Sequence, residues 1–259
     1  MNLNLKDKVY IVSGGGKGIG EAICRELAAE GAIPVIAGRA RDAGLNLQKA
    51  LENKGQKSQV ITCDLDNAQN CQMIVEKTLR EWGRIDGVVN NAGVNDGAGL
   101  ETGVEAFAES IRLNLFHYYD LVHYALPELK KHRGSIINIS SKTALTGQGG
   151  TSGYAAAKGA QLALTREWAV ELLPFGIRVN AVIPAEVSTP QYENWINTFP
   201  NPDEKLANIT KNIPLAKRMT TAGEIAAMSV FLLSDKSSHT TGQWIIPDGG
   251  YVHLDRSIT

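Results

Sequence analysis

The stretch "YIVSGGGKGIG" at residues 10–20 joins an apolar run to a cluster of glycines, and the chain continues as "EAICRELAAEG" at residues 21–31 with apolar residues at helical spacing. Glycine lacks a Cβ atom, so Gly14, Gly18 and Gly20 permit a tight turn between a strand and a helix. They also let backbone N–H groups and the positive end of the helix dipole approach a phosphate group. The stretch therefore predicts a strand, a turn and a helix that together bind a phosphorylated ligand.

Six further β-rich runs follow the first one, separated by amphipathic helical stretches. They occupy residues 33–39, 58–65, 85–93, 134–141, 176–184 and 242–250. Runs this apolar are buried on both faces, as in a parallel sheet that is covered by helices on each side. We expect an α/β fold in which residues 1–259 form a single domain, a Rossmann-type doubly wound parallel sheet of about seven strands with helices on both faces.

Residues 185–214 break this alternation, because they contain several prolines and have only short helical potential. A long insert in a compact domain is often functional. In doubly wound sheets, ligands bind beyond the carboxyl ends of the strands. The insert follows one of the predicted strands directly, so we predict a substrate lid at about residues 185–214.

The composition argues against several kinds of partner and site. The net charge is −1 with scattered charged residues, so neither a basic stripe for nucleic acid nor a polybasic patch for a membrane is present. No apolar stretch reaches the roughly 20 residues needed to cross a bilayer, and the amino terminus lacks the apolar centre of a signal peptide. Three cysteines form no C-x-x-C pair and five histidines no H-x-x-x-H pair. We expect a cytoplasmic protein without a metal site.

Tyr154 and Lys158 stand four residues apart in a long helical stretch at residues 153–172, which puts both side chains on one face. A free tyrosine has a pKa of about 10, but a neighbouring ammonium group favours the phenolate. The pair therefore predicts a general acid/base. Ser141 ends the run at residues 134–141, and we expect it to face the same space and to bind the reacting oxygen.

Taken together, these motifs resemble the short-chain dehydrogenase/reductase family. The glycines have the spacing G-x-x-x-G-x-G, "NNAG" occupies residues 90–93, and Asn114, Ser141, Tyr154 and Lys158 stand at the four catalytic positions of the family. The resemblance implies that Tyr154 exchanges a proton with the substrate and that Ser141 orients the substrate oxygen. Lys158 would lower the pKa of Tyr154, hold the nicotinamide ribose and pass the proton on through a water held by Asn114. A homotetramer built on the long helices is implied as well, with residues 251–259 at an interface.

The resemblance also implies a nicotinamide cofactor. NAD-preferring members usually carry an acid for the ribose 2′-hydroxyl where this chain has Gly38 followed by Arg39. Lys17 and Arg39 would instead hold a 2′-phosphate, so we predict NADP and keep NAD as an alternative. The implied cofactor-binding residues are Gly14, Lys17, Gly18, Ile19, Gly20, Arg39, Asp64, Leu65, Asn91, Gly93, Tyr154, Lys158, Pro184, Val187 and Thr189.

Three loops carry the residues that we predict to bind the substrate. These are Asn95, Asp96, Gln148 and Glu186, together with Ser141 and Tyr154. Such polar groups would bind several hydroxyls, whereas an apolar substrate would leave them unpaired. A sugar is therefore indicated, and the loops resemble those of bacterial L-fucose dehydrogenases, which oxidise the anomeric carbon to a lactone. D-arabinose and L-galactose remain open. The alternatives are a 3-oxoacyl carrier-protein reductase, a steroid dehydrogenase, or an NADP-sensing regulatory protein without turnover.

Overall fold

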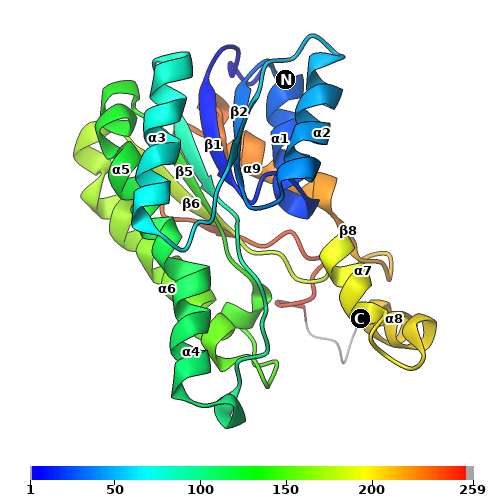
Figure 1. Ribbon diagram of the computed structural model, residues 1–259. Helices are drawn as coiled ribbons and strands as arrows, with labels where there is room; N and C mark the ends of the chain where they lie inside the picture. Colours follow the sequence, from blue (N-terminus) through cyan, green and yellow to red (C-terminus); the bar gives the residue numbers. More distant parts are fainter. Residues whose placement is uncertain (1, 255–259) are drawn as a thin grey trace.

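A seven-stranded parallel sheet forms the centre of the computed structural model, which describes residues 2–254 (Figure 1). Each of the seven β-rich runs supplies one strand, which confirms the predicted fold class. Of the stretch 251–259, the last five residues lie outside the described part of the chain. The strands are β1 (Val9–Ser13), β2 (Ile33–Gly38), β3 (Gln59–Thr62), β4 (Gly87–Asn90), β5 (Ser135–Ile139), β6 (Arg178–Val182) and β9 (Trp244–Ile245).

The strand order is β3-β2-β1-β4-β5-β6-β9, so the chain moves outward on one side of β1 and then crosses over to β4 on the other. Such a reversal opens a crevice at the carboxyl ends of the two central strands. Tyr10 pairs with Gly87 and Val12 with Val89, which brings the glycine stretch beside the residues that follow β4. The topology thus unites the segments around residues 14–20 and 90–93.

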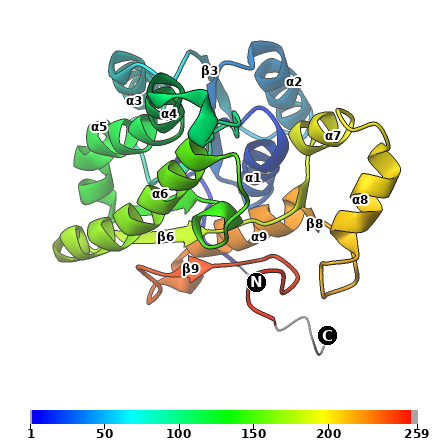
Figure 2. The same cartoon turned by 90° about the horizontal axis from the view of Figure 1, so that it is seen from below.

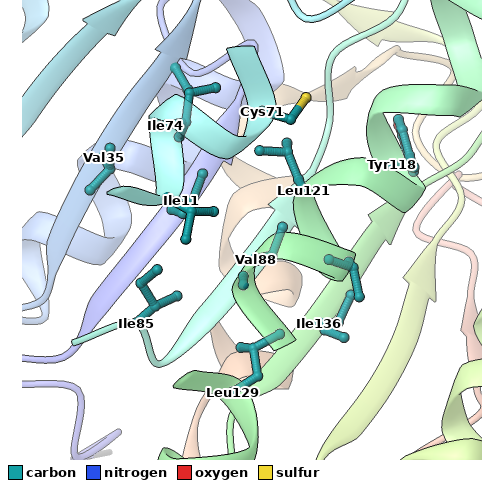
Figure 3. Close-up of a cluster of buried hydrophobic side chains, with 14 of the residues drawn as sticks. Ile11, Val35, Cys71, Ile74, Ile85, Val88, Tyr118, Leu121, Leu129 and Ile136 are labelled. Atoms are coloured by element: carbon teal, nitrogen blue, oxygen red, sulfur yellow. The ribbon is translucent and has the colours of Figure 1, made fainter. Parts of the chain in front are cut away.

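Helices cover both faces of the sheet, as Figures 1 and 2 show. The cluster of buried side chains on one face comes from α3, α5 and α6 and from the strands, and Figure 3 shows part of it around Ile11, Val88 and Leu121. The cluster on the other face joins α1, α2 and α9 to the same sheet. The helices are α1 (Gly18–Ala29), α2 (Arg41–Glu52), α3 (Ala68–Trp82), α4 (Val104–Ile111), α5 (His117–His132), α6 (Ser152–Glu171) and α9 (Ala222–Leu233).

The predicted lid folds into short elements. It contains β7 (Val187–Ser188), α7 (Pro190–Ile196) and α8 (Pro202–Thr210). Thr189 caps α7 and proline occupies its first turn, a combination that favours a helix start. β7 pairs with β8 (Thr220–Thr221), which leads directly into α9. Figures 1 and 2 show α7 and α8 projecting from the body that surrounds the sheet, tethered to it at both ends.

Candidate active site

The glycine stretch turns sharply between β1 and α1. Gly14 and Gly18 have φ angles of +66° and +56°, which side chains rarely adopt. A Cβ atom on Gly20 would collide with the carbonyl oxygen of Gly14 and come within 2.6 Å of Nδ2 of Asn91. The turn therefore needs glycine, and no side chain forms a capping hydrogen bond at the amino terminus of α1. These features fit the phosphates of a dinucleotide.

Asn91 fastens the end of β4 to this turn. Its Nδ2 donates to the carbonyl of Ser13 at 2.9 Å, and Oγ of Ser13 accepts from the backbone N–H groups of Asn91 and Ala92. The family resemblance implies a place for Asn91 near the cofactor ribose. The contacts that its side chain makes with Ser13 are structural and join the end of β4 to the glycine turn.

Asn114 lies where the regular helix is interrupted. Residues Arg112–Phe116 form a π-helix between α4 and α5, a distortion that is frequent at functional sites. The side chain of Asn114 is buried, accepts from the N–H of Val94 at 2.8 Å and donates to the carbonyl of Ser110 at 2.9 Å. Its main-chain carbonyl accepts from Nε2 of Gln161 at 2.7 Å. Asn114 thus joins α4, α6 and the loop after β4.

Ser141 and Tyr154 face one another. Burial raises the pKa of the Tyr154 phenol to about 12, and the nearby side chain of Ser141 lowers it in part. The neighbouring Ser140 points elsewhere, because its hydroxyl donates to the main-chain carbonyl of Lys158 at 2.9 Å. Ser141, and not Ser140, therefore lies beside Tyr154.

Lys158 is buried beneath this pair. Its Nζ donates to the carbonyl of Ile139 at 2.8 Å and to the phenol oxygen of Tyr118 at 3.1 Å, and it lies 5.6 Å from the ring centroid of Tyr154. Burial lowers its pKa to about 7. Burial therefore disfavours both the Tyr154 phenolate and the Lys158 ammonium. The sequence, in contrast, predicts a phenolate that is stabilised by the neighbouring lysine.

The residues predicted to hold a 2′-phosphate lie on the surface. Lys17 and Arg39 are both exposed, and a cavity of about 350 Å³ borders Lys17 between α1, α2 and Pro190 at the start of α7. Arg39 has one acidic neighbour, Asp64, with 3.9 Å between Nη1 and Oδ2. At this distance and exposure the pair is weak, so the guanidinium is available to another anion.

The remaining cofactor candidates line the same edge of the sheet. Thr189 lies next to the glycine turn, since a Cβ atom on Gly18 would be 3.5 Å from it. Gly93 passes close to two catalytic candidates, because a Cβ atom there would lie 2.9 Å from Oδ1 of Asn114 and 3.5 Å from Nζ of Lys158. The side chains of the other candidates are wholly or partly buried in the hydrophobic clusters or the loop after β6, and these are Ile19, Leu65, Pro184 and Val187.

The predicted substrate contacts are dispersed. Asp96 is exposed, and its carboxylate accepts from the N–H of Ala98 and from Oγ of Ser110, which stabilises its own loop. Asn95 caps a local turn, and Gln148 lies exposed in the loop before α6. The structure therefore does not bring these three together with the Ser141–Tyr154 pair through any described contact.

Glu186 differs from the other three. It is buried and forms an ion pair with Lys142, the residue directly after Ser141. The backbone N–H of Lys142 also donates to the carbonyl of Pro184 at 2.9 Å. The sequence did not indicate Lys142 or Tyr118. Each contacts a residue far away in the chain, Glu186 and Lys158 respectively, and neither belongs to a local motif.

Comparison with known proteins agrees with this fold. The sequence profile of a family described as enoyl-(acyl carrier protein) reductase matches residues 14–252. The chain belongs to the short-chain dehydrogenase/reductase family, and it is an NAD(P)-dependent oxidoreductase.

Its relatives differ in substrate. The chain is 35% identical over 252 residues to L-fucose dehydrogenase of Bos taurus, covering 96% of this chain and 91% of that one. It is equally 35% identical over 253 residues to 3-oxoacyl-(acyl-carrier-protein) reductase of Thermotoga maritima, covering 96% and 100%. The crystal structure of Cj0485 dehydrogenase is 48% identical with a TM-score of 0.94, covering 99% and 98%. The relatives therefore do not identify the substrate of this enzyme.

Among residues 2–254, no helix has both the length and the apolar character needed to cross a membrane. Within the same range, no three side chains of His, Cys, Asp or Glu gather closely enough to hold a metal ion.

Proposed function

We propose that this enzyme oxidises L-fucose, or a related aldose such as D-arabinose or L-galactose, at the anomeric carbon to the lactone. The observation that carries this proposal is the ion pair between the partly buried Lys142 and the buried Glu186. Lys142 directly follows Ser141 in the chain, so the pair joins the catalytic loop to the lid. Sugar hydroxyls can exchange hydrogen bonds with such a pair, whereas an acyl chain or a steroid would desolvate it without compensation. The similarity to L-fucose dehydrogenases supports the same substrate class.

Oxidation of the sugar hydroxyl requires a base, a hydroxyl group that orients the substrate and a path by which the proton leaves. We assign the base to Tyr154, which takes the proton of the sugar hydroxyl, while Ser141 donates to the same oxygen and orients it. Lys158 stabilises the developing phenolate once its ammonium form is present. Asn114 keeps the surrounding helices in register through its three hydrogen bonds. A bound nicotinamide cofactor supplies the acceptor for the hydride that leaves the sugar carbon.

We propose NADP as the preferred cofactor. Gly38 offers no carboxylate to a ribose 2′-hydroxyl, and the exposed Lys17 and Arg39 offer positive charge to a 2′-phosphate. The phosphates would lie at the glycine turn of residues 14–20, where the structure leaves room for no side chain at Gly20. NAD is the alternative.

We also propose that residues 185–214 act as the substrate lid of a single catalytic domain. The segment is tethered close to the reacting groups, since Glu186 pairs with Lys142 and Thr189 lies against Gly18. Short helices on such tethers can move as a unit when a ligand binds.

The long helices are also suited to the proposed homotetramer. Phe116 in the turn before α5, Tyr119 in α5 and Val170 in α6 expose apolar surface.

The test is a panel of aldoses assayed with NADP and with NAD, following the absorbance of the reduced cofactor. L-fucose, D-arabinose and L-galactose should be oxidised with higher kcat/KM than simple secondary alcohols. The second candidate is a 3-oxoacyl carrier-protein reductase, favoured by the relative from Thermotoga maritima. Good turnover of an acyl thioester or a steroid, with no oxidation of any aldose, would replace the sugar proposal.

A further inference from the structure

A hydroxyl group without a partner lies in the lid. Oη of Tyr192 is buried and has no hydrogen-bond partner among the described residues. Tyr192 belongs to α7, and its ring meets Trp195 edge-on with 5.2 Å between centroids. A buried polar atom without a partner costs free energy, so such an atom in a native fold calls for an explanation such as a ligand.

Tyr251 lies against the ion pair at the catalytic loop, and Tyr192 follows Glu186 by six residues in the lid. Nζ of Lys142 lies 4.6 Å from the centroid of the Tyr251 ring and also pairs with Glu186. Tyr251 is close enough to Tyr192 to help raise its pKa, which burial brings to about 12. Three segments that are far apart in the sequence, the loop after β5, the lid and the turn after β9, therefore meet around these side chains.

We infer that Tyr192, together with the Lys142–Glu186 pair, forms a subsite that binds the hydroxyls of a sugar ring remote from the reacting carbon. This inference rests on the proposed function. The phenol offers one donor and one acceptor, the ammonium offers donors and the carboxylate offers acceptors, which matches the mixed demand of neighbouring sugar hydroxyls. Lys142 adjoins Ser141 in the chain, so the subsite begins beside the reacting oxygen.

A purely structural role explains the ion pair but not the phenol. The pair links the catalytic loop to the lid, and that alone would account for Lys142 and Glu186. Phenylalanine would fill the place of Tyr192 equally well, because no described residue forms a hydrogen bond with the hydroxyl. The hydroxyl is thus the part of this cluster that points to a ligand.

The decisive variant is therefore Tyr192→Phe. Its thermal stability should equal or exceed that of the parent protein, since no described hydrogen bond is lost. KM for L-fucose should rise roughly tenfold, which corresponds to the loss of one hydrogen bond to a ligand. Turnover of a simple secondary alcohol, which has no remote hydroxyls, should not change. Tyr124→Phe, a partly buried tyrosine on α5, is the matched control and should change neither value.

Sugar analogues that each lack one ring hydroxyl sharpen the test. For the analogue without the hydroxyl that Tyr192 binds, Tyr192→Phe should cause no further loss, as in a double-mutant cycle. The double variant Lys142→Met/Glu186→Gln removes both charges together, which avoids a lone buried charge, and should likewise raise KM for sugars more than for the simple alcohol.

The outcomes separate the two proposals. If the parent protein oxidises aldoses but Tyr192→Phe leaves their KM unchanged, or impairs sugar and simple alcohol equally, the subsite is overturned and the proposed function stands. If the parent protein oxidises no aldose, the proposed function fails and the subsite fails with it.

Discussion

Nζ of Lys158 donates a hydrogen bond to the phenol oxygen of Tyr118 at 3.1 Å, whereas it lies 5.6 Å from the ring centroid of Tyr154. Tyr118 in turn donates to the carbonyl of Ile139, which also accepts from Lys158. The lysine is thus held by α5 and β5, beneath the tyrosine that shares its helix. Because these groups are buried, the protonation of Lys158 must be linked to folding.

The first prediction concerns pH and stability. Burial lowers the pKa of Lys158 to about 7 in the folded chain, and an unfolded lysine titrates near about 10.4. Between these values the unfolded chain binds more protons, so this residue's contribution to the free energy of unfolding rises with pH. Relative to Lys158→Met, the cofactor-free parent should gain on the order of 2 kcal/mol from about pH 7 to about pH 9. Urea unfolding at several pH values measures this, and parallel profiles would contradict it.

The second prediction concerns Tyr118. Tyr118→Phe removes an acceptor that favours the ammonium form, so the pKa of Lys158 should fall further. The pH-dependent rise in stability should then begin at a lower pH than in the parent protein. The same unfolding series tests this, with Tyr119→Phe on the exposed side of α5 as the control. An unchanged onset would mean that the hydrogen bond to Tyr118 does not set the lysine's pKa.

The third prediction concerns the base. Tyr154→Phe preserves the shape of the side chain but removes its ionisable oxygen, so kcat should fall by about two to four orders of magnitude, as is usual for acid/base catalysis. Cofactor affinity, measured by fluorescence titration, should survive. A variant with near-native turnover would remove Tyr154 from its assigned role.

The fourth prediction compares two helical glycines. A Cβ atom on Gly20 would collide with the backbone of Gly14, whereas one on Gly159 would meet nothing within 4 Å. Gly20→Ala should therefore destabilise the chain by roughly 1–3 kcal/mol and weaken cofactor binding. Gly159→Ala, in the interior of α6, should stabilise it by roughly 0.5–1 kcal/mol. Thermal and urea unfolding measure both, and equal effects would refute the close approach at Gly20.

The strands were predictable because a run buried on both faces is apolar along its whole length. The residues at which the strands end were harder to predict. The run at residues 242–250 yields only β9, Trp244–Ile245, because Pro247 lacks an N–H donor and Gly249 and Gly250 adopt positive φ angles. Helical spacing predicts that Tyr154 and Lys158 share one face, and the end of a strand places Ser141, whereas Asn114 is a candidate through the family resemblance alone.

The substrate region was harder to read, because its contacts join distant parts of the chain. The sequence predicts that Glu186 binds substrate hydroxyls from a loop, and nothing local indicates that Lys142 pairs with it. The sequence likewise predicts that Asp96 binds the substrate, yet its carboxylate accepts a hydrogen bond from Ser110 on α4. Such pairings depend on how the loops close over the sheet, which neither periodicity nor spacing encodes.

The last prediction concerns cofactor choice. Lys17 and Arg39 are exposed, so Lys17→Ala/Arg39→Ala should leave stability nearly unchanged. If both bind a 2′-phosphate, the loss of charge-assisted hydrogen bonds worth roughly 1.5–3 kcal/mol each should weaken NADP at least about tenfold. NAD lacks that phosphate, so its affinity should hardly change and the preference should move toward NAD. Titration of both cofactors into the double variant, with exposed Lys54→Ala/Arg80→Ala as the control, decides the matter. Equal weakening of both cofactors would show that the two residues bind something common to them, and the assignment of NADP would then lose its basis.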